Sequence, residues 1–222
     1  MKKFGSISHA LKRLRSDTSG ISLVEFALIL PIILTLGLYG TEVARMANTK
    51  TKVSQIALSM ADNASRLGQT DNSGVTPTIT ENDVLAILNG AQRQGQSIDM
   101  AENSRIIISS LEYDDPTDRQ FIAWQRCIGD LDVDSRYGDD EDNNGLVGDE
   151  LPGMGEGTTK ITALSNTAVM FVEVTYQYSS LWDNPFGSGD GIFYEEAAFL
   201  IRDDRNLEPG LTGTTPSESE CS

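Results

Sequence analysis

The chain is poor in the residues on which many enzymes and nucleic-acid binders depend. Its 222 residues include one histidine, two cysteines, and 17 lysines and arginines against 33 aspartates and glutamates. The lone histidine, His9, leaves the rest of the chain without a histidine base, a serine triad or a histidine-ligated metal. The net charge of −16 argues against a nucleic-acid surface, since such binding needs clustered cations. No spacing singles out a catalytic carboxylate pair, so we do not expect an enzyme.

The few cations are unevenly placed. Residues 1–20 hold five cations and one anion, which leaves 12 cations and 32 anions, a net charge of −20, for residues 21–222. Positive charge flanking an apolar segment is retained in the cytoplasm. This pattern predicts a basic cytoplasmic leader at residues 1–20, with the acidic body on the other side of the inner membrane.

The longest apolar run supplies the membrane segment. Residues 21–40 contain a single charged side chain, Glu25, and are long enough to cross a bilayer as a helix. A cleavable secretory signal is the alternative, but the apolar core is long and no small-x-small cleavage site follows closely. A buried core helix fits less well, because the run is apolar around its whole circumference. We predict a single-pass helix in contact with lipid.

A short motif marks the start of this run. Gly20 precedes it, Glu25 lies five residues after the glycine, and the aromatic Phe26 follows directly. A carboxylate within an apolar run usually has a function, although Glu25 could instead stay hydrated at the cytoplasmic interface. The motif resembles the processing site of class III prepilins. Together with the Ala-Leu-Ile-Leu-Pro stretch that follows, it resembles the TadE-like family of minor pseudopilins of tight-adherence pili.

The resemblance implies a processing and assembly function. A membrane prepilin peptidase would cut between Gly20 and Ile21, where glycine offers flexibility and no side chain to obstruct the protease. The new α-amino group of Ile21 would be mostly cationic at neutral pH and could pair with Glu25 of a neighbouring subunit, which sets the register of packed helices. Glu25 and Phe26 are the assembly residues on this view. The implied partners are other pilin and pseudopilin subunits and the inner-membrane assembly platform.

Beyond the membrane segment, the pattern predicts an α+β head. Apolar residues at helical spacing extend one long helix over residues 21–67, and residues 68–80 have a linker composition. A second helix is predicted at 81–94, with Thr80 as its cap and Asp83 three residues later. Strands are predicted at 105–113, 120–128, 168–179 and 191–201. We expect a pilin-like head at 81–210, in which a small antiparallel sheet packs on the long helix, and a C-terminal tail at 211–222.

The long loop between the second and third strands is strongly acidic. Residues 130–150 hold nine acidic residues and one cation, which is most often a solvated loop. However, Asp140-x-Asp142-x-Asn144-Gly145 matches the first half of a calcium loop, although position twelve is Leu151 rather than glutamate. Calcium is therefore a possible cofactor at a site unlike an EF-hand. Its candidate ligands are Asp140, Asp142, Asn144, Leu146, Asp149 and Glu150.

The two cysteines, Cys127 and Cys221, both lie in the part predicted to be outside the cytoplasm. In an oxidising compartment they are expected to form one disulfide bond, which would fasten the C-terminal tail to the second strand. Two free thiols are the alternative.

Two function hypotheses follow. The first is a minor pseudopilin that takes part in assembly of a tight-adherence pilus after cleavage by a prepilin peptidase. The second is an unprocessed, membrane-anchored module for calcium-dependent binding or adhesion. The N-terminal residue of the mature protein distinguishes them, since it is Ile21 in the first case and Met1 in the second.

Overall fold

The structure is a computed structural model that describes residues 20–68, 76–181, 191–202 and 205–221. The chain divides into two compact units, Met1–Arg45 and Met46–Ser222. One helix, α2 (Ile21–Ser65), contributes to both. The predicted leader lies outside the described residues except for Gly20, and so does most of the predicted linker.

Burial of the side chains of α2 differs between its first and second parts. Pro31 lies inside the helix, and the hydroxyl of Thr35 donates to the Pro31 carbonyl at 2.7 Å. In the second unit the helix buries one face, and the spacing of three or four residues between its buried side chains is that of an amphipathic helix. These buried residues are Thr49, Val53, Ile56, Ala57, Met60, Ala61, Ala64 and Ser65.

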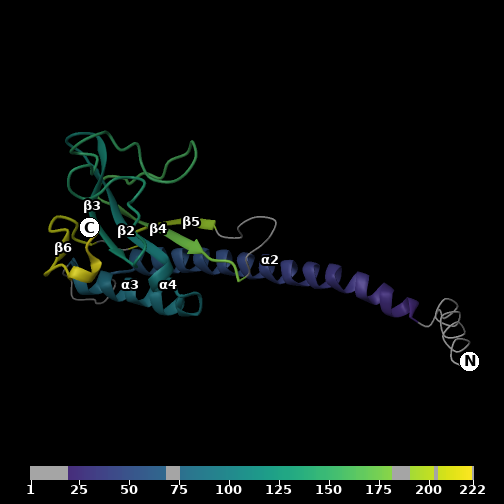
Figure 1. The fold of residues 1–222 in the computed structure, drawn as a ribbon. Coiled ribbons are helices and arrows are strands. Elements are labelled where there is room, and N and C mark those ends of the chain that lie inside the picture. Colours follow the sequence, from purple (N-terminus) through teal and green to yellow (C-terminus); the bar gives the residue numbers. More distant parts are fainter. Residues whose placement is uncertain (1–19, 69–75, 182–190, 203–204, 222) are drawn as a thin grey trace, which may run out of the picture. The chain divides into compact units, whose positions relative to one another are not determined.

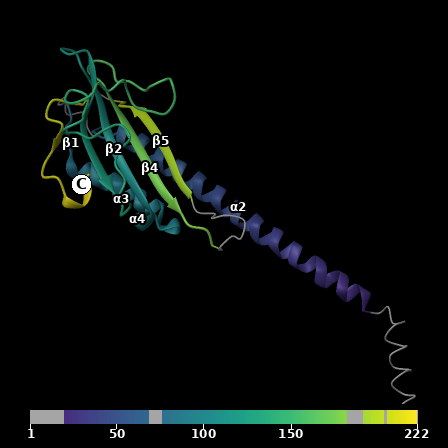
Figure 2. The same ribbon diagram turned by 45° about the horizontal axis from the view of Figure 1, so that its top comes forward.

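Four strands form the sheet of the head, as predicted from the sequence. They are β2 (Ser104–Asp114), β3 (Arg119–Ile128), β4 (Ala168–Tyr178) and β5 (Gly191–Leu200). Their order is β3-β2-β4-β5 and every pairing is antiparallel (Figure 2). Apolar residues from this sheet and from the second part of α2 share one buried cluster, so the predicted α+β, pilin-like fold is confirmed.

Short helices complete the layer on this face of the sheet. Helix α3 (Glu81–Gln94) begins with a capping box, in which the Thr80 hydroxyl accepts from the Asp83 backbone and the Asp83 carboxylate accepts from the Thr80 backbone. A 3₁₀ turn (Gln96–Ile98) and α4 (Met100–Asn103) then lead into β2. Figure 1 shows α3 and α4 on the same side of the strands.

The opposite face of the sheet is covered by the long loop at 129–167. Leu151, Met154 and Ala163 of this loop are buried in a second apolar cluster with Leu111 of β2 and Phe171 of β4. The register of β2 against β3 shifts between Ser110 and Leu111. The shift brings Ile122 into this loop-side cluster and Trp124 into the helix-side cluster, although the two residues are only two apart.

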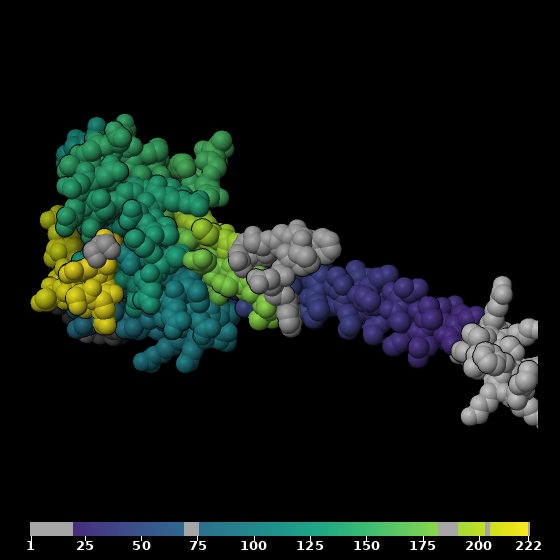
Figure 3. Space-filling model, in the orientation of Figure 1, coloured from purple at the N-terminus to yellow at the C-terminus, as the bar shows by residue number. Residues whose placement is uncertain are grey.

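The end of the chain is built into the head. Strand β1 (Ile79–Thr80) pairs in parallel with β6 (Leu211–Thr212), and a second 3₁₀ turn follows at Ser217–Ser219. The space-filling view shows these last residues, in yellow, beside the teal residues of the head (Figure 3).

Candidate functional site

The predicted processing motif lies at the beginning of α2. Gly20 is an exposed turn residue, and its carbonyl accepts a hydrogen bond from the backbone of Val24 at 3.2 Å, so the helix begins directly after it. A Cβ added to Gly20 would meet no atom within 4 Å of the part of the chain that is described. The fold of this chain therefore does not explain why a glycine stands at this position.

Gly129 shows what a structurally required glycine looks like in this chain. It has a φ of +108°, and a Cβ there would lie 2.1 Å from the carbonyl oxygen of Ser104. A side chain at Gly129 would be strained and would clash, whereas a side chain at Gly20 meets neither obstacle. Gly37 and Gly40 of α2 have equally open space for a Cβ.

The residues after Gly20 present an apolar surface. Ile21 and Phe26 are 53% and 62% exposed, and Glu25 on the same helix is also exposed. Within the described residues, Glu25 has no hydrogen-bonding or charged partner. The most apolar stretch of α2 has no buried residue and is long enough to cross a membrane. An exposed helix of this kind is the form expected of a membrane anchor or a pilin-like segment.

The acidic motif in the long loop covers the edge of β3. The Asp140 carboxylate accepts from the backbone of Gln125 at 2.9 Å and from Nη1 of Arg126 at 3.1 Å. The Asn144 backbone carbonyl accepts from the Ile122 backbone at 2.8 Å, and its side chain accepts from the backbone of Leu146 at 3.0 Å. These oxygen atoms hold the loop and the strand edge in place.

The predicted calcium site is not supported. Asp142, Asp149 and Glu150 are exposed. No group of three or more His, Cys, Asp or Glu side chains among the described residues could hold a metal ion. Gly145, read from the sequence as the turn of a calcium loop, instead lets the chain approach β3, because a Cβ there would lie 2.4 Å from the Gln120 carbonyl oxygen.

The predicted disulfide is confirmed. Cys127 and Cys221 are bonded, with their Cα atoms 5.0 Å apart. Cys127 is 1% exposed, whereas Cys221 lies at the surface. The bond fastens the tail to the edge strand β3.

Beside the disulfide lies a buried ion pair that the sequence did not predict. Arg126 binds both carboxylate oxygens of Glu81, through Nη2 at 2.6 Å and Nε at 2.9 Å, and the hydroxyl of Thr215 donates to Glu81 at 2.8 Å. Burial raises the pKa of Glu81, but the hydrogen bonds from Arg126 and Thr215 outweigh this effect and leave the pKa lowered. This network joins α3, β3 and the tail.

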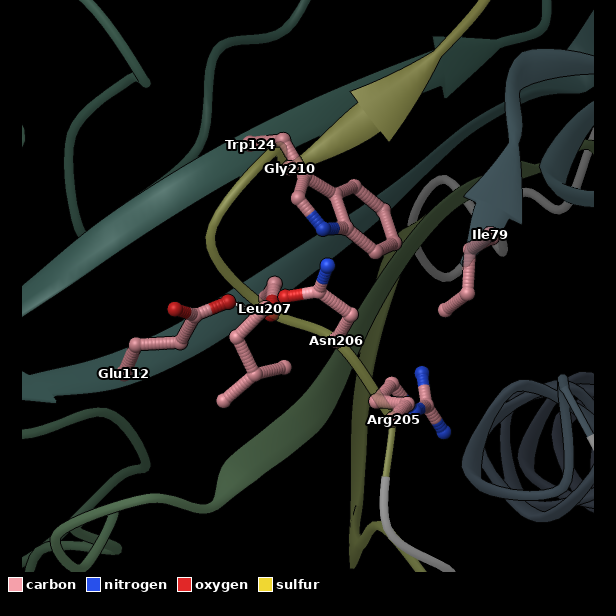
Figure 4. Close-up of a pocket in the computed structure, with 8 residues that line it drawn as sticks. Ile79, Glu112, Trp124, Arg205, Asn206, Leu207 and Gly210 are labelled. Atoms are coloured by element: carbon pink, nitrogen blue, oxygen red, sulfur yellow. Dashed lines mark hydrogen bonds between the residues drawn. The ribbon is translucent and has the colours of Figure 1, made fainter. Parts of the chain in front are cut away.

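A second buried carboxyl group, Glu112, lies beneath the tail. It lines a cavity of about 10 Å³, close to the space of one water molecule, together with Trp124, Arg205 and Leu207 (Figure 4). The Ser110 hydroxyl donates to Glu112 at 2.9 Å, but burial dominates and raises its pKa to about 7. In the sequence, Glu112 is one glutamate within the strand predicted at 105–113, and the local pattern does not mark it as buried.

Comparison with known proteins finds a family match over the whole of α2. Residues 20–65 match the family model of TadE-like proteins. The resemblance predicted from Gly20, Glu25 and the apolar run is therefore confirmed over this segment. No curated protein and no solved structure matches the chain.

Proposed function

We propose that this chain is a minor pseudopilin of a tight-adherence pilus, cleaved by a prepilin peptidase between Gly20 and Ile21. The observation that carries the proposal is the TadE-like match over residues 20–65, which begins at Gly20 and includes Glu25. The open space around Gly20 supports it, since the fold gives no reason of its own for a glycine at this junction.

The exposed apolar surface of α2 supports the proposed location. The leader would stay in the cytoplasm because of its five cations, the apolar part of α2 would lie in the inner membrane, and the head would lie outside the cytoplasm. The disulfide between Cys127 and Cys221 agrees with a head in an oxidising compartment. The proposed partners are the prepilin peptidase, other pilin and pseudopilin subunits and the assembly platform in the membrane.

Glu25 has a defined task in this proposal. Cleavage would create an α-amino group on Ile21, which is mostly cationic at neutral pH. In a bundle of packed helices, this amine and the Glu25 carboxylate of a neighbouring subunit would offset each other's desolvation. A shift by one residue would separate the two charges, so the pair would fix the register of one subunit against the next.

The cleavage is tested by mass spectrometry of the protein extracted from cells that contain the matching peptidase. The unaltered chain should begin at Ile21, and Gly20→Val should retain its leader, because a branched side chain obstructs the scissile bond. Gly37→Val is the matched control, since Gly37 also has open space for a Cβ but lies within the helix. Cleavage of Gly20→Val, or a mature protein that begins at Met1, would refute the processing step.

The assembly step needs a separate readout. Glu25→Gln keeps the shape of the side chain but removes its charge, so the protein should be cleaved and accumulate in the membrane while pili are lost. Ser22→Ala removes a neutral polar group from the same segment and should leave pili intact. Normal piliation with Glu25→Gln would exclude the register function while leaving the cleavage result unaffected.

A further inference from the structure

Three polar side chains meet on the loop-side face of the sheet. Glu173 is the single acidic residue of β4 and is 2% exposed, and Tyr194 and Glu196 stand on the neighbouring strand β5. The Tyr194 hydroxyl lies 2.7 Å from Oε1 of Glu173 and 2.8 Å from Oε1 of Glu196. One phenolic oxygen therefore bridges two carboxyl groups.

The same two carboxyl groups hold the long loop on the sheet. Glu173 accepts from the Ser135 hydroxyl at 2.6 Å and from the Arg136 backbone at 3.1 Å. Glu196 accepts from the Tyr137 hydroxyl and, at 3.0 Å, from the Glu156 backbone. The loop at 135–156 is thus attached to β4 and β5 through oxygen atoms of these two side chains.

The two contacts of Tyr194 need two hydrogens, but the Tyr194 hydroxyl supplies only one. A tyrosine hydroxyl has one hydrogen to donate, and an ionised carboxylate can only accept. If both glutamates were ionised, one of the two contacts of Tyr194 would bring a lone pair against a carboxylate oxygen at hydrogen-bonding distance. A proton on one carboxyl group removes this conflict, because that group then donates to Tyr194 and Tyr194 donates to the other.

The surroundings indicate which group carries the proton. Each carboxyl group has two donors besides Tyr194, so the count of donors does not separate them. Burial does, because Glu173 is 2% exposed whereas Glu196 is only partly buried, and burial disfavours the charged form. We propose that Glu173 is a proton-binding site of the folded head, and that loss of this proton loosens the loop at 135–156 from the sheet.

Three cations lie near the two carboxyl groups, and each also contacts another group in the described part of the chain. The Arg136 guanidinium lies over the Tyr194 ring, 3.3 Å from its centroid, and pairs with Glu156 at 2.5 Å. Lys160 lies 5.8 Å from the centroid of the Tyr137 ring and donates to the Gly155 carbonyl. On β2, Arg105 shares the face of Glu173, and its Nη1 donates to the Gly129 carbonyl at 3.2 Å.

The titration of these groups follows from the same contacts. Burial raises the pKa of Glu173, and the charge of Glu196 adds to the rise. Burial and the carboxylates also raise the pKa of Tyr194 and of Tyr137, so both remain phenols. As the pH increases, Glu173 is the member of the cluster that loses a proton, and its contact with Tyr194 then becomes repulsive.

The test uses the full chain in detergent micelles with ¹³C-labelled glutamate carboxyl groups. The Glu173 resonance is assigned by its absence in Glu173→Gln, and its midpoint should lie above the ~4.3 of an unperturbed glutamate. Glu196→Gln should lower this midpoint, because Tyr194 can then donate to Glu173. Glu102→Gln, at an exposed position, is the control and should leave it unchanged.

Hydrogen exchange provides the second readout. Peptides that cover residues 135–156 should lose protection in the unaltered chain, after correction for intrinsic exchange, as the pH passes the Glu173 midpoint. A midpoint in the ordinary glutamate range would overturn the proposal, whether or not the variants fold. A raised Glu173 midpoint that stays the same in Glu196→Gln would also overturn the proposal, because burial of Glu173 alone would then account for the raised value.

Discussion

The Arg205 guanidinium lies 3.0 Å from the carbonyl oxygen of Ser65, the last residue of α2. Its Nη2 is also 3.1 Å from the Ala64 carbonyl, and the backbone of Arg202 donates to Ser65 at 3.1 Å. The last carbonyls of a helix have no helical partner, and a cation there interacts favourably with the helix dipole. The segment after β5 therefore closes the end of the long helix.

Replacement of Arg205 by methionine should weaken the head. Hydrogen bonds from a charged group contribute about 1.5–3 kcal/mol each, so we expect a loss of roughly 2–4 kcal/mol in the free energy of unfolding. Chemical denaturation of the full chain in detergent measures it. Arg202→Met is the matched control, because its side chain is 42% exposed and an exposed ion pair contributes about 1 kcal/mol or less. Equal losses in the two variants would mean that Arg205 does not cap the helix.

The Glu81–Arg126 pair predicts sensitivity to acid. The folded-state pKa of Glu81 is lowered, so its contribution is fully present above the unfolded pKa of ~4.3 and is lost as the pH falls through the folded value. Arg126→Met leaves a buried carboxylate without its cation and should cost about 3–5 kcal/mol at neutral pH. Melting temperatures at several pH values should show this deficit shrinking as Glu81 becomes protonated.

Arg66→Met serves as the control for Arg126→Met. The Arg66 side chain is 49% exposed and pairs with Asp62 one helical turn away. Removal of the Arg66 charge should lower the melting temperature only slightly, and by nearly the same amount over this pH range, because exposed ion pairs contribute little to stability. A deficit for Arg126→Met that stays constant down to acidic pH would show that Glu81 does not depend on Arg126.

The contribution of Glu112 to the stability of the head should depend on pH in the opposite direction. Its pKa is raised to about 7, so the stability of the folded form decreases as the pH rises from ~4.3 towards 7 and is constant above. The full effect of this one group is roughly 4 kcal/mol, from the difference between its two pKa values. Glu112→Gln keeps the hydrogen bond with Ser110 and should flatten the fall in melting temperature over that range. An unaltered slope in this variant would mean that the pKa of Glu112 is not raised in the folded head.

The sequence predicted those parts of the fold that depend on local pattern. Runs of strand-forming residues bounded by turn residues located the four strands, and the Thr80–Asp83 spacing located the start of α3. The pairing of β1 with β6 was not predicted, because two-residue strands have no periodicity and depend on contacts between distant segments.

The TadE-like segment was predictable because its motif is contiguous in the chain. Gly20 and Glu25 are five residues apart, and one short segment contains the entire signal. The calcium hypothesis is not supported, and its physical difficulty is that oxygen atoms suited to a metal are equally suited to the backbone N–H groups of a strand edge and to Arg126. Neighbours brought close by the sheet, such as Glu173 and Glu196, could not be found before the register of β4 and β5 was known.

The last prediction concerns the disulfide, whose two sulfur atoms have different environments. Cys127 is buried in β3 and Cys221 is exposed, and the two are 94 positions apart in the sequence. In the chain-entropy account, a loop of this size contributes about 4–5 kcal/mol, so either serine variant should melt at a lower temperature. The unaltered chain, alkylated without reduction, should show no modified cysteine and should yield a peptide that joins the two.

The two variants should then differ in reactivity. Cys127→Ser leaves the exposed thiol of Cys221, which should be alkylated rapidly in the folded chain. Cys221→Ser leaves the buried thiol of Cys127, which should react only as fast as β3 and the tail separate, because a covered thiol is protected until the structure opens locally. Equal rates in the two variants would mean that the tail leaves β3 once the bond is absent. In that case the disulfide itself, rather than the contacts of β6 and Thr215, keeps the end of the chain on the head.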